Sequence, residues 1–412
     1  MNAATEPVAT AARLVPLTEA VELNPRPERG ALRDDLEVSF VPMAALEAAT
    51  GRMDASGARP FGEVKKGYTV FREGDVLFAK ITPCMENGKM AVARGLRNGV
   101  GCGSTELHVL RPRPGVDPHY VYHFVSSARF RAEAAHHMKG AVGQKRVPAA
   151  FLERCEIPLP DLGDQRRIVA EIEKQFSRLD EAVANLKRVE ASLKRYSGAC
   201  LHSAFDLVPQ SQSTAIAILG DVVEAIVDCP HSTPKWTSEG FICIRTTDFL
   251  PGRLDLSAPR FVSRETFHQR NARLVPRAGD ILYSREGGIL GIACEVPVGI
   301  ELCLGQRMLL IRAGQRVLSR FVMHWLNSRH ILERVRVLVG GSASPHLNVR
   351  DIRAFPVPVP TLEEQGRVVA EVDRRLSIVR EVESEIDANL QRARLLRRAV
   401  LARAFQIMRL GA

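Results

Sequence analysis

The sequence predicts an α/β (α+β) fold in which two domains of mixed β-sheet and helix are separated by two long helices that pair as an antiparallel coiled coil. Residues 157–205 return without a gap at 357–405, and both copies carry a heptad pattern of apolar residues. The segments before the two copies share one order of turns and apolar runs. A repeat this long in two copies indicates a duplicated half-molecule with pseudo-two-fold symmetry, not a solenoid.

The 412 residues are enough for two to four domains with ordinary apolar cores. The expected order is a disordered tail at 1–12, a first domain at 13–160, a long helix at 161–206, a second domain at 207–360 and a second long helix at 361–408. We expect antiparallel helix pairing to place the two domains at opposite ends of a spacer.

Within each domain, a Gly-Asp turn precedes a β-rich apolar run, at 74–78 and again at 279–283. Residues 120–127 and 321–328 have the apolar spacing of a short core helix. This pattern favours hydrogen-bonded core histidines at His123 and His324 over functional ones.

A polar, glycine-containing loop follows at 140–147 in the first domain and at 340–347 in the second. We expect each loop to lead into the last strand before the long helix. The loop sequences differ between the domains, although the frame around them is shared. A shared frame with different loops predicts different ligands of one class.

Apolar residues occupy the a and d heptad positions of both long helices, and Glu190, Ser197, Glu383 and Arg397 interrupt them. Each helix of about 43 residues would span roughly 65 Å. Pairing with a second molecule is the alternative to pairing within the chain. The two glutamates either fix the helix register or are solvated. The seam positions are Val169, Ile172, Phe176, Leu179, Val183, Leu186, Leu193 and Cys200, then Val369, Val372, Leu376, Val379, Ile386, Leu390, Ala393 and Val400.

The starts of both helices have capping signals. Thr361 and Glu364 form a predicted capping box, and Asp161 with Asp164 offers a weaker version at the first helix. Prolines just before each start hold the incoming chain extended, where they cannot break the helix.

The net charge of +10 and the isoelectric point near 9.4 favour a polyanionic partner, because basic side chains on phosphates release condensed counterions. Only ten of the 57 basic residues are lysine, and arginine makes forked bonds to guanine edges and phosphates. A GC-rich genome that favours arginine codons explains this bias equally well.

The eight cysteines include no C-x-x-C pair and no histidine at zinc-finger spacing, which argues against a structural zinc site. The sequence has neither a signal peptide nor an apolar run of membrane-spanning length. We therefore expect a cytoplasmic protein without a membrane partner, whose thiols are reduced and mostly buried.

Polar and basic residues in the turns are candidate contacts to phosphates or base edges. In the first domain they are Lys80, Thr82, Asn87, Lys89, Ser104 and Thr105. In the second domain they are His231, Ser232, Thr233, Lys235, Arg245, Arg285, Gln306 and Arg307.

Motifs for catalysis are absent from the sequence. It has no G-x-x-x-x-G-K-[ST] phosphate loop and no serine nucleophile elbow. The segment 24–27 lacks the second consecutive proline and the aromatic residue that an adenine-amino methyltransferase uses to hold a flipped base. Downstream of Pro160-Asp161 there is no acid-x-Lys of a metal nuclease. We expect no catalytic residues and no metal site, so partners would supply the chemistry.

The chain resembles the specificity subunit of a type I restriction-modification system over nearly its whole length. The proline-flanked helix starts at 157–168 and 357–365 match the two conserved regions of that family. Residues 143–148 look like the loop that closes a target-recognition domain, and 231–235 resemble a frequent opening of another. The second closing loop, 341–348, departs from the family's G-Q-K form, which leaves its contacts open.

The resemblance implies two target-recognition domains that each read one half of an interrupted double-stranded DNA site, with the helices setting the gap. It adds closing-loop contacts to the candidates: Gln144, Lys145, Arg146, Ser344 and His346. It also implies docking of two methyltransferase (M) subunits that bind S-adenosylmethionine, and through them of restriction (R) subunits that use ATP and Mg. None of these cofactors is expected on this chain. A coiled-coil scaffold that binds no DNA, and a solitary endonuclease, are the rival interpretations.

Overall fold

The structure is a computed structural model that describes residues 12–26, 32–141, 143–206, 215–340 and 345–406. It has two compact units. Residues 1–186 and 388–412 form the first unit, and residues 187–387 form the second. Each long helix therefore contributes one part to each unit.

The first unit begins with β1 (Arg13–Pro16), α1 (Leu17–Ala20), β2 (Val21–Leu23), β3 (Glu37–Val41), β4 (Ala58–Pro60), α2 (Phe61–Val64), β5 (Thr69–Arg72) and β6 (Val76–Ala79). It continues with β7 (Met90–Val92), β8 (Val100–Gly103), β9 (Leu107–Pro112), α3 (Pro118–Ser126), α4 (Ala128–His136), α5 (Ala149–Arg154), β10 (Glu156–Leu159) and the start of α6 (Leu162–Asp206).

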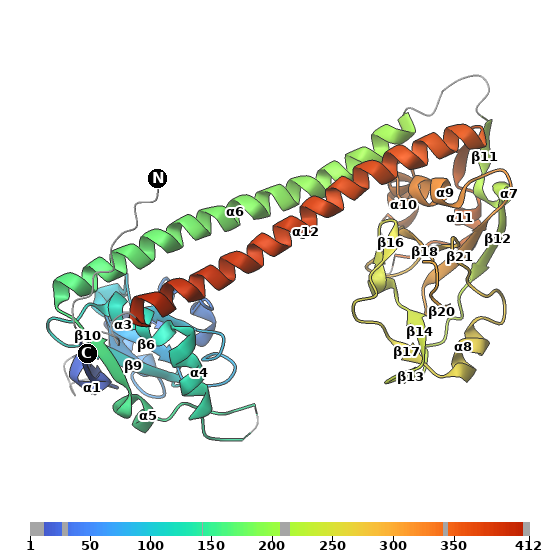
Figure 1. Ribbon diagram of the computed structural model, residues 1–412. Coiled ribbons are helices and arrows are strands. Elements are labelled where there is room, and N and C mark those ends of the chain that lie inside the picture. The colour runs from blue at the N-terminus through green and yellow to red at the C-terminus, as the bar shows by residue number, and fades with distance from the viewer. Residues whose placement is uncertain (1–11, 27–31, 142, 207–214, 341–344, 407–412) are drawn as a thin grey trace, which may run out of the picture. The chain divides into compact units, whose positions relative to one another are not determined.

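Two four-stranded sheets form the first domain, in the orders β2-β9-β6-β7 and β4-β3-β8-β5. Strand β6 is buried on both faces. Successive side chains of a strand point to opposite sides, so alternate residues of β6 enter two different cores. Val76 and Phe78 join the core under α3 and α4, whereas Leu77 and Ala79 join the core shared with the other sheet. Figure 1 shows β6 and β9 of the first of these sheets beside the start of α6.

The second unit begins with β11 (Ala215–Ile218), α7 (Leu219–Val222), β12 (Val223–Asp228), β13 (Trp236–Thr237), β14 (Phe241–Ile244), β15 (Phe249–Leu250), β16 (Arg253–Leu254), β17 (Phe261–Val262) and α8 (Arg264–Arg270). It continues with β18 (Ile281–Ser284), β19 (Ala293–Glu295), β20 (Leu302–Leu304), β21 (Met308–Ala313), α9 (Ser319–Leu326), α10 (Arg329–Val339), α11 (Val349–Arg353), β22 (Pro356–Val359) and α12 (Leu362–Gln406).

The second domain repeats one of the two sheets of the first, since the order β12-β21-β18-β19 matches β2-β9-β6-β7. Its other four-stranded sheet runs β13-β17-β14-β20. Each domain has one parallel pair, β3 with β8 and β14 with β20, but β8 is an inner strand and β20 an edge strand. Strand β18 is the counterpart of β6: Ile281 and Tyr283 lie in one core and Leu282 lies in the other. The predicted internal repeat is thus confirmed for the strand order of one sheet in each domain.

The predicted turns and core helices are present. Gly74 and Gly279 lead into β6 and β18 with φ of +84° and +87°, values that glycine adopts without steric cost. The predicted core helices are α3 and α9. The closing loops, however, do not lead directly into the last strand, because α5 and α11 intervene before β10 and β22. These helices of six and five residues are too short to show a periodicity.

The two long helices pair with each other in antiparallel fashion, as the sequence predicted. In the first unit, Ile172 and Phe176 near the start of α6 pack on Leu401 near the end of α12. In the second unit, Leu201 near the end of α6 packs on Val372 near the start of α12. Each helix has 45 residues.

The interruptions of the heptad seam have separate roles. Glu190 bonds to Lys194 one turn further along its own helix, so this glutamate is solvated. Arg397 instead bonds to Asp180 at 2.6 Å and lies 4.0 Å from the centre of the Phe176 ring. This arginine therefore joins α12 to α6 in the first unit.

The predicted caps are present at both helix starts. The Glu364 backbone N–H donates to the Thr361 hydroxyl at 3.3 Å, and the Thr361 N–H donates to the Glu364 carboxylate at 2.9 Å. At α6, the Asp164 N–H donates to Asp161 at 2.8 Å, which is the weaker, one-sided version.

Six of the eight cysteines are buried and all eight are unpaired thiols, as expected. Residues 1–11 of the predicted tail lie outside the described residues, and Ala12 is buried. In the part of the chain that the structure describes, no helix has the length and apolarity to cross a bilayer.

Candidate nucleic-acid interface

Three segments of the first domain meet at one end of β6 and form what we name the first loop cluster, residues 80–82, 104–106 and 144–146. The Lys80 N–H donates to the Glu106 carbonyl at 2.9 Å, and the Lys80 carbonyl accepts from Val147 at 2.8 Å. Thr82 and Lys145 exchange two further bonds, at 3.0 and 3.1 Å. Backbone bonding therefore brings together candidates that lie up to 66 residues apart in the sequence.

Two charged side chains of the first loop cluster, Arg146 and Glu106, pair with each other. The Arg146 guanidinium makes a forked ion pair with Glu106, with its shortest bond at 2.7 Å. Hydrogen bonding from Arg146 lowers the pKa of Glu106, against the effect of burial. Thr105, Gln144 and Lys145 are exposed beside this pair. The cluster thus presents a carboxylate acceptor and several donors to solvent.

Two candidates in the β6–β7 loop differ in their availability. Asn87 is exposed at the loop surface. The Lys89 ammonium donates to the Met43 carbonyl at 2.9 Å, so this lysine braces the loop against a neighbouring segment. Ser104 accepts from the Glu106 N–H at 3.2 Å and shapes the turn before β9.

The second domain has an equivalent arrangement, the second loop cluster, residues 228–235, 285–286, 305–307 and 345–347. The Arg285 N–H donates to the Arg307 carbonyl at 3.0 Å, and the Arg285 carbonyl accepts from Leu347 at 2.8 Å. Residue 286 forms a bridge with His346, as residue 81 does with Arg146. Arg285 is therefore the backbone counterpart of Lys80.

The Arg285 side chain is buried and paired, which sequence reasoning did not anticipate. Its guanidinium makes two 3.0 Å bonds to Asp228, one 3.2 Å bond to the Leu347 carbonyl and an ion pair with Glu286 at 2.8 Å. Only 7% of the side chain is exposed. Arg285 thus holds the end of β12 to the closing loop.

The buried side chain of Arg270 holds the start of the 231–235 segment in place. Its guanidinium donates to four backbone carbonyls, those of Pro230, Ser232, Leu304 and Gly305, at 2.5 to 3.1 Å. The arginine is 7% exposed. It joins the two segments that carry most of the second-domain candidates. Its isolated position in α8 gave no sequence signal for this role.

The side chains above Arg270 form a small polar network. His231 lies 3.1 Å from Asp228, Thr233 donates to Gln306 at 3.4 Å, and Gln306 donates to the His231 carbonyl. Ser232, Lys235, Arg307 and His346 are exposed around this network. Ser344 lies outside the described residues.

Arg245 lies at the end of β14. Its guanidinium bonds to Asp248 within the following turn and to the Ala258 carbonyl at 3.1 Å. This arginine is half-buried and stabilises its own turn. Among the described residues, no group of three or more His, Cys, Asp or Glu side chains is arranged to hold a metal ion.

A glutamine near the start of each long helix joins that helix to its domain. The Gln165 side chain accepts from Asp117 at 2.8 Å and donates to Pro160 at 2.8 Å. Gln365 accepts from Leu318 at 2.8 Å and donates to Pro360 at 2.9 Å. Both side chains are buried. The recurring glutamine of the repeat is therefore a fixed domain–helix joint.

Two domains that share one sheet order, each with a polar loop cluster and each joined to a helical pair, define a class of duplicated two-domain proteins. A family model for the type I restriction modification DNA specificity domain matches residues 22–195 and again 217–390. The chain belongs to this family.

Curated relatives agree with the family match. The specificity subunit of the type I restriction enzyme EcoEI of Escherichia coli is 39% identical over 168 residues, which are 40% of this chain and 28% of that subunit. The match to this relative thus spans well under two thirds of its length. The StySPI specificity subunit of Salmonella potsdam is 24% identical over 325 residues, covering 75% of this chain and 68% of the relative.

Solved structures share the fold. A chain from a study of assembly and conformational transition of the type I R-M system superposes with a TM-score of 0.73 at 21% identity, covering 96% of this chain and 98% of that one. The HsdS subunit from Thermoanaerobacter tengcongensis gives a TM-score of 0.57 at 20% identity, covering 96% and 97%.

Proposed function

We propose that this chain is the DNA sequence-recognition subunit of a type I restriction-modification complex and is not itself an enzyme. The observation that carries the proposal is the repeated loop frame, in which Lys80 and Arg285 make equivalent backbone bonds while the surrounding side chains differ. One frame with two sets of polar side chains suits two different half-sites in one polymer.

The domains at 13–160 and 207–360 would each read one half-site, and the helices at 161–206 and 361–408 would set the gap. Gln144, Lys145 and Thr105 are the exposed readers proposed for the first domain, and His231, Lys235, Arg307 and His346 for the second. Arg285, Lys89 and Arg245 would position loops, because their side chains are bonded within the protein.

Partners would supply the chemistry. The proposed complex contains double-stranded DNA, two methyltransferase subunits with S-adenosylmethionine, and restriction subunits that use ATP and Mg. A complex that acts on chromosomal and invading DNA would work in the cytoplasm, which suits a chain with eight unpaired thiols.

Single-molecule methylation mapping tests the proposal. DNA from cells with this gene and its methyltransferase should show a methyladenine motif of two short blocks and a fixed gap, and the motif should vanish when this gene is deleted. An unchanged methylome in cells with a demonstrably active methyltransferase would contradict the proposal and favour a scaffold.

A further inference from the structure

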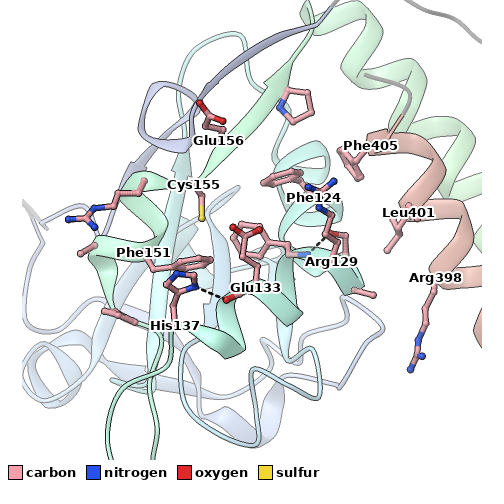
Figure 2. Close-up of a pocket in the computed structure, with 18 of the residues that line it drawn as sticks. Phe124, Arg129, Glu133, His137, Phe151, Cys155, Glu156, Arg398, Leu401 and Phe405 are labelled. Carbon is pink, nitrogen blue, oxygen red and sulfur yellow. Dashed lines mark hydrogen bonds between the residues drawn. The ribbon is translucent and has the colours of Figure 1, made fainter. Parts of the chain in front are cut away.

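The first unit contains a cavity of about 430 Å³ where the end of α12 meets α4, α5 and β10. This volume is within the range of roughly 300–1,000 Å³ typical of ligand pockets. Figure 2 shows Phe124 and Phe151 on the domain side and Leu401 and Phe405 on the helix side. An apolar interior is thus open to solvent at a domain–helix joint.

Basic side chains dominate the rim of this cavity. Among the residues that the structure describes, Arg129, Arg154 and Arg398 have no ion-pair partner, and all three are exposed. Other arginines of this unit, such as Arg146 and Arg397, are paired with carboxylates. The charged lining residues are Arg129, Lys139, Arg154 and Arg398 against Glu133 and Glu156. The rim therefore carries an excess of two positive charges.

Comparison of the two repeats shows that the side chains that make this cavity basic are found in the first unit and not in the second. Leu401 and Phe405 recur as Leu201 and Phe205, so the helix side of the joint is the same in both units. The residues that open and charge the cavity do not recur. Arg398 corresponds to Gly198, Ala402 to His202, Arg129 to His330 and Arg154 to Ala354.

Aromatic rings occupy the equivalent place in the second unit. The His330 ring stacks on Trp325 with centroids 5.2 Å apart and lies 5.1 Å from the His202 ring. Phe355, fully buried, stands where the first unit has Cys155. The two joints have thus diverged, one toward a filled aromatic cluster and the other toward an open, basic cavity.

We propose that the cavity receives an acidic segment of the methyltransferase subunit that carries one aromatic or branched apolar side chain, so that the two methyltransferase copies dock unequally. The apolar side chain would enter the cavity against its lining residues Phe151 and Leu401, and the acidic residues would pair with Arg129 and Arg398. This inference rests on the proposed function, because that function supplies the partner.

A protein segment fits the cavity better than DNA does. A phosphate gains nothing from the aromatic lining of the cavity, whereas an apolar side chain gains free energy when that lining removes it from water. Protein–protein interfaces commonly have a buried apolar or aromatic anchor at the centre and polar or charged residues at the rim.

Two variants of the full chain test this inference by different means. The double variant R129H/A402H installs the two histidines of the second unit and fills the cavity. The variant R398E reverses one exposed rim charge, so it cannot act by loss of the core. The matched control is R94E, which reverses an exposed arginine in the turn after β7, outside the cavity.

The measurement is calorimetric titration of the purified methyltransferase subunit into each variant, with the number of bound copies counted by native mass spectrometry. Both cavity variants should weaken one of the two binding steps by about tenfold or more and leave the other unchanged. R94E should behave as wild type.

Each other outcome overturns the inference. Equal affinity of the wild-type chain and both cavity variants would show that nothing docks there. Weakened DNA binding by R398E without a change in methyltransferase binding would assign the cavity to the DNA surface. If the wild-type chain binds no methyltransferase at all, the proposed function fails instead, and the two failures are thereby distinguished.

Discussion

His123 and His324 are buried at equivalent positions of α3 and α9, but their surroundings differ. His324 lies 3.0 Å from Asp373 of α12. Neither ring nitrogen of His123 has a partner among the described residues, so the prediction of a hydrogen-bonded core histidine was wrong there. The counterpart of Asp373 is Glu173, which lies 3.3 Å from His119 instead. Whether His119 or His123 contacts the carboxylate of Glu173 depends on tertiary packing, which no sequence pattern specifies.

His123 makes the stability of the first unit depend on pH. Burial, with smaller effects of His119 and Arg397, lowers the pKa of His123 from 6.5 to about 3. Between these values the unfolded chain binds a proton that the folded chain does not, so stability falls as pH falls below about 6.5. The loss approaches about 1.4 kcal/mol per pH unit.

The variant H123F should therefore lose less stability than wild type between pH 7 and pH 5, as measured by urea unfolding. H136F, a substitution of an exposed histidine at the end of the next helix, α4, serves as control. Parallel pH profiles of wild type and H123F would refute the assignment.

Arg270 should set the specificity of one half-site only. The variant R270K replaces a fork that reaches four carbonyls with a single ammonium, at a cost of about 1.5–3 kcal/mol for lost charged hydrogen bonds. We expect relaxed base preference in the half-site read by the second domain and an unchanged first half-site, as measured by methylation mapping. R277K is the exposed control. Equal relaxation of both half-sites would exclude a local positioning role.

Among the elements, the long helices were the most predictable because heptad spacing persists over many turns. Val169, Ile172 and Phe176 are buried at predicted seam positions, and the caps lie where the prolines and acidic residues indicated. The paired Arg397 was seen only as an interruption, since its bond to Asp180 joins residues 217 positions apart. The polar loop clusters were recognised by composition, but the buried Arg270 and the half-buried Asp228, which hold the second cluster together, were not.

Seam packing should dominate helix stability in the first unit. I172A removes a side chain that is 2% exposed and should lower the free energy of unfolding by about 2–5 kcal/mol. L395A changes a leucine that is 62% exposed and should stay within about 0.5 kcal/mol of wild type. Urea unfolding followed by circular dichroism compares them, and similar losses in both variants would contradict the predicted seam.

For the whole molecule, duplication means that each unit is completed by both halves of the sequence. Phe405, from the second half, packs on Tyr120 and Phe124 of the first domain at centroid distances of 5.4 and 5.5 Å. Phe205, from the first half, packs on Phe321 and Trp325 of the second domain at 5.3 and 5.2 Å. The repeated phenylalanine thus closes each domain with the helix that began in the other.

This arrangement allows a test of whether the helices set the gap. Shortening one helix alone would misalign its seam residues with those of the other helix, so both helices must be shortened together. Deleting 187–193 from α6 and 383–389 from α12 removes one heptad from each helix and keeps both seams in register. The paired deletion shortens each helix by about 10 Å.

At 3.4 Å per base pair, we expect the gap in the methylated motif to shorten by about three base pairs while both half-site sequences stay the same. Deleting 187–193 alone is the matched control, and it should abolish methylation because the seams no longer match. An unchanged gap in the paired deletion would refute the spacer role, since rigid helices of different length cannot hold two readers at one separation.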